Sequence, residues 1–184
     1  TTLANANDGI APLANIIANT ANPQIIYARV TNTTSGCYSI TDFKLIVYPV
    51  PTANLSVAPT AICAGENATV TFTGTPDGTI EYTINGGTVQ TAVLNAAGTF
   101  TLTQTLTAET TYTLSYIKII DNNGTMLCSQ ALNASVTVTV SPLPVATISG
   151  TATICSGDAA TITFNGTPNA TVTYTFNGGA NQQI

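Results

Sequence analysis

Residues 63–87 read CAGENATVTFTGTPDGTIEYTINGG, and residues 155–179 read CSGDAATITFNGTPNATVTYTFNGG. The two segments align without a gap at an offset of 92 residues, and 15 of their 25 positions are identical. Identity of this kind over a fixed offset indicates that a structural unit has been duplicated. We therefore predict an array of repeats with a period of about 92 residues.

Apolar side chains alternate with threonine inside the repeat. The clearest runs cover residues 69–73, 79–84, 99–106 and 136–140, and weaker ones lie near 55–57 and 88–94. A period of two is typical of half-buried strands, and β-branched threonine favours extended backbone. Turn sequences such as Asn85-Gly86-Gly87 separate the runs, so neighbouring strands should be antiparallel. About seven strands in roughly 90 residues predict an all-β fold, with tandem immunoglobulin-like antiparallel β-sandwich repeats.

Two proline-rich segments, Pro49-Val50-Pro51 and Pro142-Leu143-Pro144, stand before the two copies. Proline stiffens the backbone, so both segments are interpreted as short, semi-rigid linkers. They divide the chain into three parts. Residues 1–48 are expected to be the C-terminal half of one repeat, 49–141 a complete repeat, and 142–184 the N-terminal half of the next. We thus expect the chain to be a window from a longer array.

Charge is sparse, with three Lys or Arg residues and eight Asp or Glu residues in 184. Three scattered cations cannot neutralise a row of phosphates, which argues against nucleic acid or an anionic membrane surface as a partner. No apolar run approaches the roughly 20 residues that a membrane-spanning helix needs. We therefore expect no membrane span in this segment.

The four cysteines are Cys37, Cys63, Cys128 and Cys155, and the chain contains no histidine. This composition argues against a structural zinc site. Cys63 and Cys128 belong to the complete repeat and are the predicted disulfide pair, while Cys37 and Cys155 would pair outside the window. The alternative is four free thiols, but an oxidising compartment fits the rest of the composition better.

No catalytic residue or cofactor site is expected, because histidine is absent and no serine or threonine has an evident base beside it. Glu66 and Asp158 occupy the same repeat position and are weak calcium candidates, with Asp77 as a further ligand. The alternative is a solvated acidic turn residue. Calcium usually takes six to eight oxygen ligands, and Asp77 becomes Asn169 in the next copy, so the alternative is favoured.

Two other features have a functional and a structural interpretation. Tyrosines could stack on sugars, but Tyr82 and Tyr174 occupy equivalent inward strand positions, which favours packing in the core. The uncharged threonine faces could support lateral self-association of repeats, since charged residues normally protect edge strands. Short edges, prolines and secretion would make the low charge harmless, and this second interpretation is favoured.

Residues 22–49, NPQIIYARVTNTTSGCYSITDFKLIVYP, followed by the two duplicated blocks, resemble repeats of giant secreted surface proteins of Bacteroidota. That family includes the gliding-motility adhesin SprB. The resemblance implies type IX secretion, an extracellular location on the bacterial outer cell surface, and an extended stalk or filament in adhesion or gliding motility. It supplies no catalytic residues.

The partners expected from this resemblance are neighbouring repeats of the same chain and surface polysaccharide or other cells. Two alternatives remain open. The repeats could be spacers of a secreted multidomain hydrolase, or subunits of a self-assembling extracellular filament.

Overall fold

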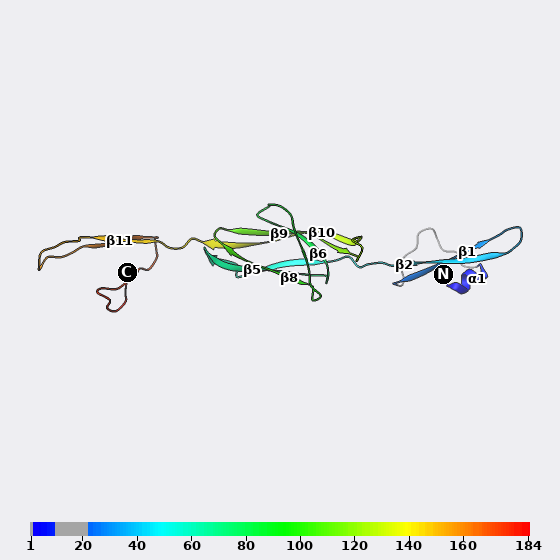
Figure 1. The fold of residues 1–184 in the computed structure, drawn as a ribbon, viewed down its shortest axis with the longest axis horizontal. Coiled ribbons are helices and arrows are strands. Elements are labelled where there is room, and N and C mark those ends of the chain that lie inside the picture. Colours follow the sequence, from blue (N-terminus) through cyan, green and yellow to red (C-terminus); the bar gives the residue numbers. More distant parts are fainter. Residues whose placement is uncertain (1, 10–21) are drawn as a thin grey trace.

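The computed structural model describes residues 2–9 and 22–184. Positions 1 and 10–21, which fall in the predicted N-terminal half-repeat, lie outside the described residues. Figure 1 shows the described parts in a row, with an N-terminal hairpin, a central sandwich and C-terminal hairpins. The structure is mostly strand with almost no helix, which confirms the all-β prediction.

The central sandwich is built from consecutive strands packed as two sheets. They are β3 (Ala53–Ala58), β4 (Ala61–Cys63), β5 (Glu66–Gly74), β6 (Thr79–Ile84), β7 (Gln90–Val93), β8 (Thr99–Leu106), β9 (Thr110–Ile120) and β10 (Met126–Ser141). One sheet has the order β3-β5-β8 and the other β4-β10-β9-β6-β7. Neighbours are antiparallel, except that β4 runs parallel to β10. This two-sheet arrangement is that of an immunoglobulin-like sandwich.

The core lies between the two sheets and takes one side chain in two from each strand. Val70 and Phe72 of β5 and Ile80 of β6 are fully buried, as their alternation with threonine predicts. The Phe72 ring packs on Tyr82 with 4.9 Å between centroids and on Phe100 with 6.0 Å. Because every member of this cluster belongs to β3–β10 or the loops between them, the sandwich has a core of its own.

Threonine hydroxyls cover the outer faces of the sheets. Thr69 and Thr103 share a hydrogen bond of 2.9 Å between neighbouring strands, and Thr111 and Thr137 share one of 2.8 Å. Neutral hydroxyl pairs of this kind stabilise cross-strand contacts on a hydrated surface. They account for a sheet surface that stays polar with very little charge.

The N-terminal part consists of α1 (Leu3–Asp8), β1 (Gln24–Thr31) and β2 (Tyr38–Leu45), and the two strands form an antiparallel hairpin. Arg29 ties these elements together. Its guanidinium lies 3.8 Å from the centre of the Tyr38 ring and donates a hydrogen bond of 2.5 Å to the carbonyl oxygen of Asn7. One of the few cations of the chain therefore has a structural contact with the helix.

The C-terminal part consists of β11 (Ala146–Gly150), β12 (Ile162–Gly166), β13 (Thr173–Tyr174) and β14 (Gln182–Gln183). Its geometry repeats that of the central sandwich. Ile148 pairs with Phe164 as Leu55 pairs with Phe72. Phe164 stacks on Tyr174 at 5.0 Å, close to the spacing of the Phe72 and Tyr82 rings. The duplication read from the sequence is thus a duplication of structure.

Candidate functional site

The proline linkers are held firmly where each one joins the following repeat. Pro51 is fully buried, and the next residue, Thr52, is hydrogen-bonded to Thr75. Thr52 N–H donates to Thr75 Oγ1 at 3.0 Å, and Thr75 N–H donates to the Thr52 carbonyl at 2.8 Å. A Cβ atom on Gly74 would lie 2.3 Å from the Thr52 oxygen, so only glycine allows this close approach.

The hydrogen bonds between the residue after the linker and the threonine after β5, which we call the clamp, recur at the second linker between Val145 and Thr167. Val145 N–H donates to Thr167 Oγ1 at 3.0 Å, and Thr167 N–H donates to the Val145 carbonyl at 2.9 Å. Gly166 takes the place of Gly74, because a Cβ atom there would lie 2.5 Å from the Val145 oxygen. The clamp is therefore a repeated feature of the junctions between repeats.

We call the end of the sandwich where Ser141 leads into the second linker the downstream pole. The end of β10 is held by hydrogen bonds at this pole. The turn after β4 is attached to the end of β10, since Ala64 N–H donates to the Ser141 carbonyl at 2.8 Å. Cys63 N–H donates to Glu66 Oε2 at 2.9 Å, and Gly65, with a φ of 93°, donates to the Leu106 carbonyl at 2.8 Å. Positive φ at this position favours glycine.

Between the last clamped residue of one repeat and the first of the next lie only Pro142, Leu143 and Pro144. Two prolines in three residues leave little freedom of backbone rotation. The chain thus passes from one repeat to the next through a short, stiff connection.

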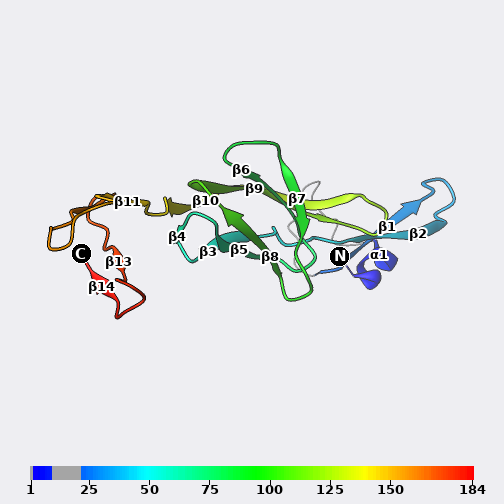
Figure 2. The same ribbon diagram turned by 60° about the vertical axis from the view of Figure 1, so that its left-hand side comes forward.

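Cys128 lies at the opposite end of the sandwich, which we call the upstream pole. It belongs to the hairpin of β9 and β10, opposite Ile119 and close to the turn at residues 121–125. Asp121 Oδ1 closes that turn by accepting from the backbone N–H groups of Asn123 and Thr125 at 2.9 and 2.8 Å. Figure 2 shows the tip of this hairpin reaching toward the N-terminal part of the chain.

The predicted disulfide between Cys63 and Cys128 is wrong for this fold. The register of β4 and β10 sets Cys63 beside Ser141, thirteen residues further along the same strand than Cys128. At about 3.3 Å per residue, and allowing for the bulge after Ala131, this separation is more than about 35 Å. A disulfide needs Cα atoms within about 7 Å. All four cysteines are free thiols in the structure.

Sequence spacing assigns Cys63 and Cys128 to one repeat, but it does not reveal the pole at which each lies. The missed signal is the strand order. Cys63 ends β4, which runs parallel to β10 beside its last residues, whereas Cys128 stands near the start of β10, so the two must lie at opposite ends. Cys37 follows the turn of the β1–β2 hairpin, and Cys155 begins a turn with Gly157 at a φ of 97°, like that of Gly65.

The acidic candidates for calcium are not brought together. Glu66 begins β5 and its carboxylate accepts from the Cys63 N–H, which is the structural role of a turn residue. Asp77 follows the other end of β5, in a turn where it has a φ of 60°. The shared site of these two residues is therefore wrong, and Asp158 lies apart in the C-terminal part. Among the described residues, no group of three His, Cys, Asp or Glu side chains could hold a metal ion.

Two tyrosines lie in the core, as expected for Tyr82. Tyr82 donates to Gln90 Oε1 at 3.1 Å, and Tyr112 donates to Gln104 Oε1 at 2.6 Å, so both buried hydroxyls have a partner. Burial raises the pKa of Tyr82 above its ordinary value, and burial together with the nearby Tyr82 raises the pKa of Tyr112. Neither ring is available to stack on a sugar.

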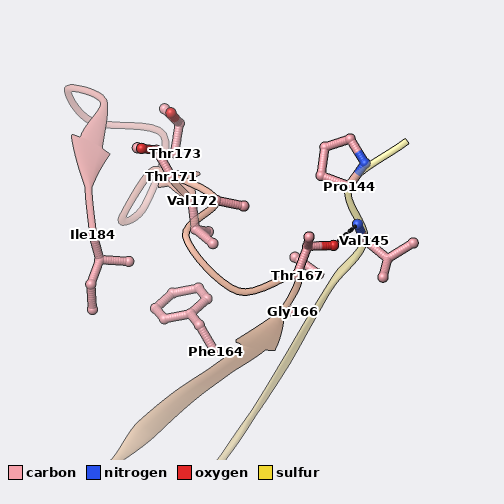
Figure 3. Close-up of a pocket in the computed structure, with 11 residues that line it drawn as sticks. Pro144, Val145, Phe164, Gly166, Thr167, Thr171, Val172, Thr173 and Ile184 are labelled. Atoms are coloured by element: carbon pink, nitrogen blue, oxygen red, sulfur yellow. Dashed lines mark hydrogen bonds between the residues drawn. The ribbon is translucent and has the colours of Figure 1, made fainter. Parts of the chain in front are cut away.

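A cavity of about 440 Å³ lies in the C-terminal part, and Figure 3 shows Phe164, Val172 and Ile184 around it. The lining is largely apolar. Phe164 and Val172 correspond to Phe72 and Ile80, which are fully buried in the central repeat. The strands that cover those side chains there, β8 and β9, have no counterpart in residues 142–184. The cavity is the open core of this part rather than a ligand site.

A family model described as the Flavobacterium inter-domain disulphide bond domain matches residues 1–51, a segment that contains Cys37 and ends at the first linker. No curated protein matches the chain. In the part of the chain that the structure describes, no helix is long and apolar enough to cross a membrane. The match to residues 1–51 points to a protein of the Flavobacteriaceae.

Proposed function

We propose that this chain is part of the shaft of a large secreted surface protein, in which tandem sandwich repeats hold an adhesive region away from the cell. The single observation that carries the proposal is the junction between repeats. The chain enters the central sandwich at one pole and leaves at the other. Both linkers are hydrogen-bonded where they join the following repeat, and the second is also held at the end of β10. Repeats joined in this way extend in one direction.

The chemistry of the surface also fits this function. The sheets are covered by threonine, and the cavity in the C-terminal part is an open core. Nothing in the described residues gathers the acid, base or nucleophile that catalysis requires, and a non-enzymatic role follows from this proposal. The adhesive contact with polysaccharide or with other cells belongs to parts of the protein beyond this shaft.

The cellular setting is part of the same proposal. Secretion by the type IX route, a place on the bacterial outer cell surface, and a role in adhesion or gliding motility like that of SprB follow from the resemblance of residues 22–49 to such repeats. The match to a Flavobacterium domain agrees with this origin. Spacer repeats in a secreted hydrolase would have the same junctions. The reading frame on either side of this segment distinguishes the two functions, since that of a hydrolase would encode a catalytic domain there.

The proposal is tested by antibody labelling of intact cells. Fab fragments raised against residues 49–141 should label unpermeabilised cells, with gold particles distributed tens of nanometres outside the outer membrane. Deletion of several repeats should bring the label closer to the membrane and leave the labelling of an unrelated surface protein unchanged. Label that appears only after permeabilisation, or a reading frame that encodes a catalytic domain with few repeats, would contradict the proposal.

A further inference from the structure

The central repeat carries cysteines at two positions on opposite poles, and the N-terminal and C-terminal parts each carry one cysteine at an equivalent position. Cys63 and Cys155 occupy the turn that we have placed at the downstream pole, and both are exposed. Cys128 occupies the hairpin at the upstream pole, and Cys37 follows the turn of the corresponding hairpin in the N-terminal part. Since the two thiols of one repeat are too far apart to meet, the nearest thiols of the same chain are those of the neighbouring repeats.

The axial positions of these cysteines follow from the strand register. Ala61 pairs with Thr139, and β3 runs beside β10 in the same direction as β4. We follow β10 back from Thr139 to Cys128, and the neighbouring segment back from Ala61 by the same number of residues, less the extra residue of the bulge after Ala131. Cys128 is then level with about Pro51 in the linker. The hairpin cysteine of a repeat therefore lies beside the linker that precedes the repeat.

The same count gives the gap across a junction. Cys63 is level with Ser141, and the hairpin cysteine of the following repeat is level with about Pro144, the equivalent of Pro51. Three linker residues separate these levels, which is about 10 Å along the axis. A disulfide spans about 4.4 to 6.8 Å between Cα atoms, so the two cysteines must approach by about a further 3 Å, which movement of the hairpin tip can supply. The distance within one repeat is more than three times larger.

We propose that at every junction the downstream cysteine of one repeat forms a disulfide with the hairpin cysteine of the next repeat. Cys63 would thus bond to the cysteine that takes the place of Cys128 in the following repeat, and Cys128 to the cysteine that takes the place of Cys63 in the preceding repeat. This inference rests on the proposed end-to-end shaft. The family description of residues 1–51, with its inter-domain disulphide bond, is a second observation that points to cross-linked repeats, and the structure adds which cysteines pair.

The chemistry is an ordinary oxidation of two thiols. One bond forms between two Sγ atoms, two protons are released, and two electrons pass to an oxidant of the disulfide class, which is reduced to a dithiol or to two thiols. The hydrogen bonds that fix the Cys63 turn hold one of the two sulfurs in place on the end of the sandwich. Because both junctions in this chain contain only one of their two cysteines, all four thiols should stay free in residues 1–184.

The test uses two copies of residues 49–141 in tandem, so that Pro49-Val50-Pro51 takes the place of the second linker. The central repeat has its own core and supplies both cysteine positions. After oxidation with glutathione disulfide, intact mass should fall by two hydrogens, which corresponds to one bond between Cys63 of the first copy and Cys128 of the second. A single copy treated in the same way is the control and should keep two free thiols.

Position-specific variants identify the pair. Cys63→Ser in the first copy should abolish the bond, and Cys63→Ser in the second copy should leave it intact; Cys128→Ser should give the reverse pattern. Loss of four hydrogens would mean bonds within repeats. That result, covalent dimers on a non-reducing gel, or the absence of any bond would each overturn the connectivity.

Small-angle scattering of the reduced tandem, set beside the mass of the oxidised tandem, separates this inference from the proposed function. A reduced tandem that is extended but forms no disulfide on oxidation would refute the bond and keep the shaft, whereas a reduced tandem that is folded back, and yet forms the bond on oxidation, would refute the shaft.

Discussion

Replacement of Phe72 by alanine tests the claim that the central repeat is an independent unit with its core between β5, β6 and β8. The ring is fully buried and packs on Tyr82 at 4.9 Å and on Phe100 at 6.0 Å. Removal of a buried phenylalanine ring costs about 3–5 kcal/mol, because apolar contacts are lost and a cavity remains. Since a domain of this size is stable by only about 5–15 kcal/mol, the loss is a large share of the total.

The assay is urea denaturation and thermal unfolding of the 184-residue chain, followed by circular dichroism. Phe72→Ala should lower the free energy of unfolding of the main transition by about 4 kcal/mol and its midpoint by roughly 20 °C. The matched control is Phe164→Ala, at the equivalent position of the C-terminal part, where the ring lines an open cavity. This change should leave the main transition unaffected. Equal effects of the two variants, or a Phe72→Ala loss below about 1 kcal/mol, would show that the central repeat does not have an independent core around Phe72.

Three further outcomes are expected. Gly74→Ala should destabilise the central repeat by at least about 2 kcal/mol in urea denaturation, because its Cβ would meet a linker carbonyl at 2.3 Å, whereas Gly166→Ala should not alter that transition. Burial raises the folded-state pKa of Tyr82 and Tyr112 above 10.0, so stability present below pH 10 is lost as the pH rises beyond it. Alkaline denaturation should be shallower for the double Tyr→Phe variant, and an unchanged profile would count against burial of both hydroxyls. Glu66→Gln should cost about 1 kcal/mol by weakening the turn bond at 2.9 Å, and calcium should not shift the melting of the unaltered chain; a clear shift in calorimetry would revive the metal site.

The sequence predicts most strands of the sandwich because alternation leaves a direct signal. In 79–84 every second side chain is apolar, and in 99–106 only Gln104 interrupts the same alternation; β6 and β8 cover these residues. β4 is different, since Ala61–Cys63 is too short to show a period, and its place beside β10 depends on tertiary packing. The parallel pairing of that short strand determines the downstream pole.

The positions of the cysteines and of the acidic residues were harder to predict, because they too depend on tertiary packing. Spacing shows that Cys63 and Cys128 share a repeat, but position along the axis of the sandwich depends on the direction of each strand. Likewise, Glu66 and Asp77 are close in sequence and stand at opposite ends of β5. The clamp between Thr52 and Thr75 leaves no pattern in a single copy, and the second copy reveals it only through Gly166 and Thr167.

The central claim, that the repeats extend end to end, is tested most directly by small-angle X-ray scattering of proteins with two, four and six tandem copies of residues 49–141. One repeat contributes a sandwich of about eleven strand residues, as in β9, and a linker of three to four residues, or roughly 45 Å in total. The maximum dimension should grow linearly, by about this length for each added copy. Growth that levels off, as in repeats folded back on one another, would contradict it.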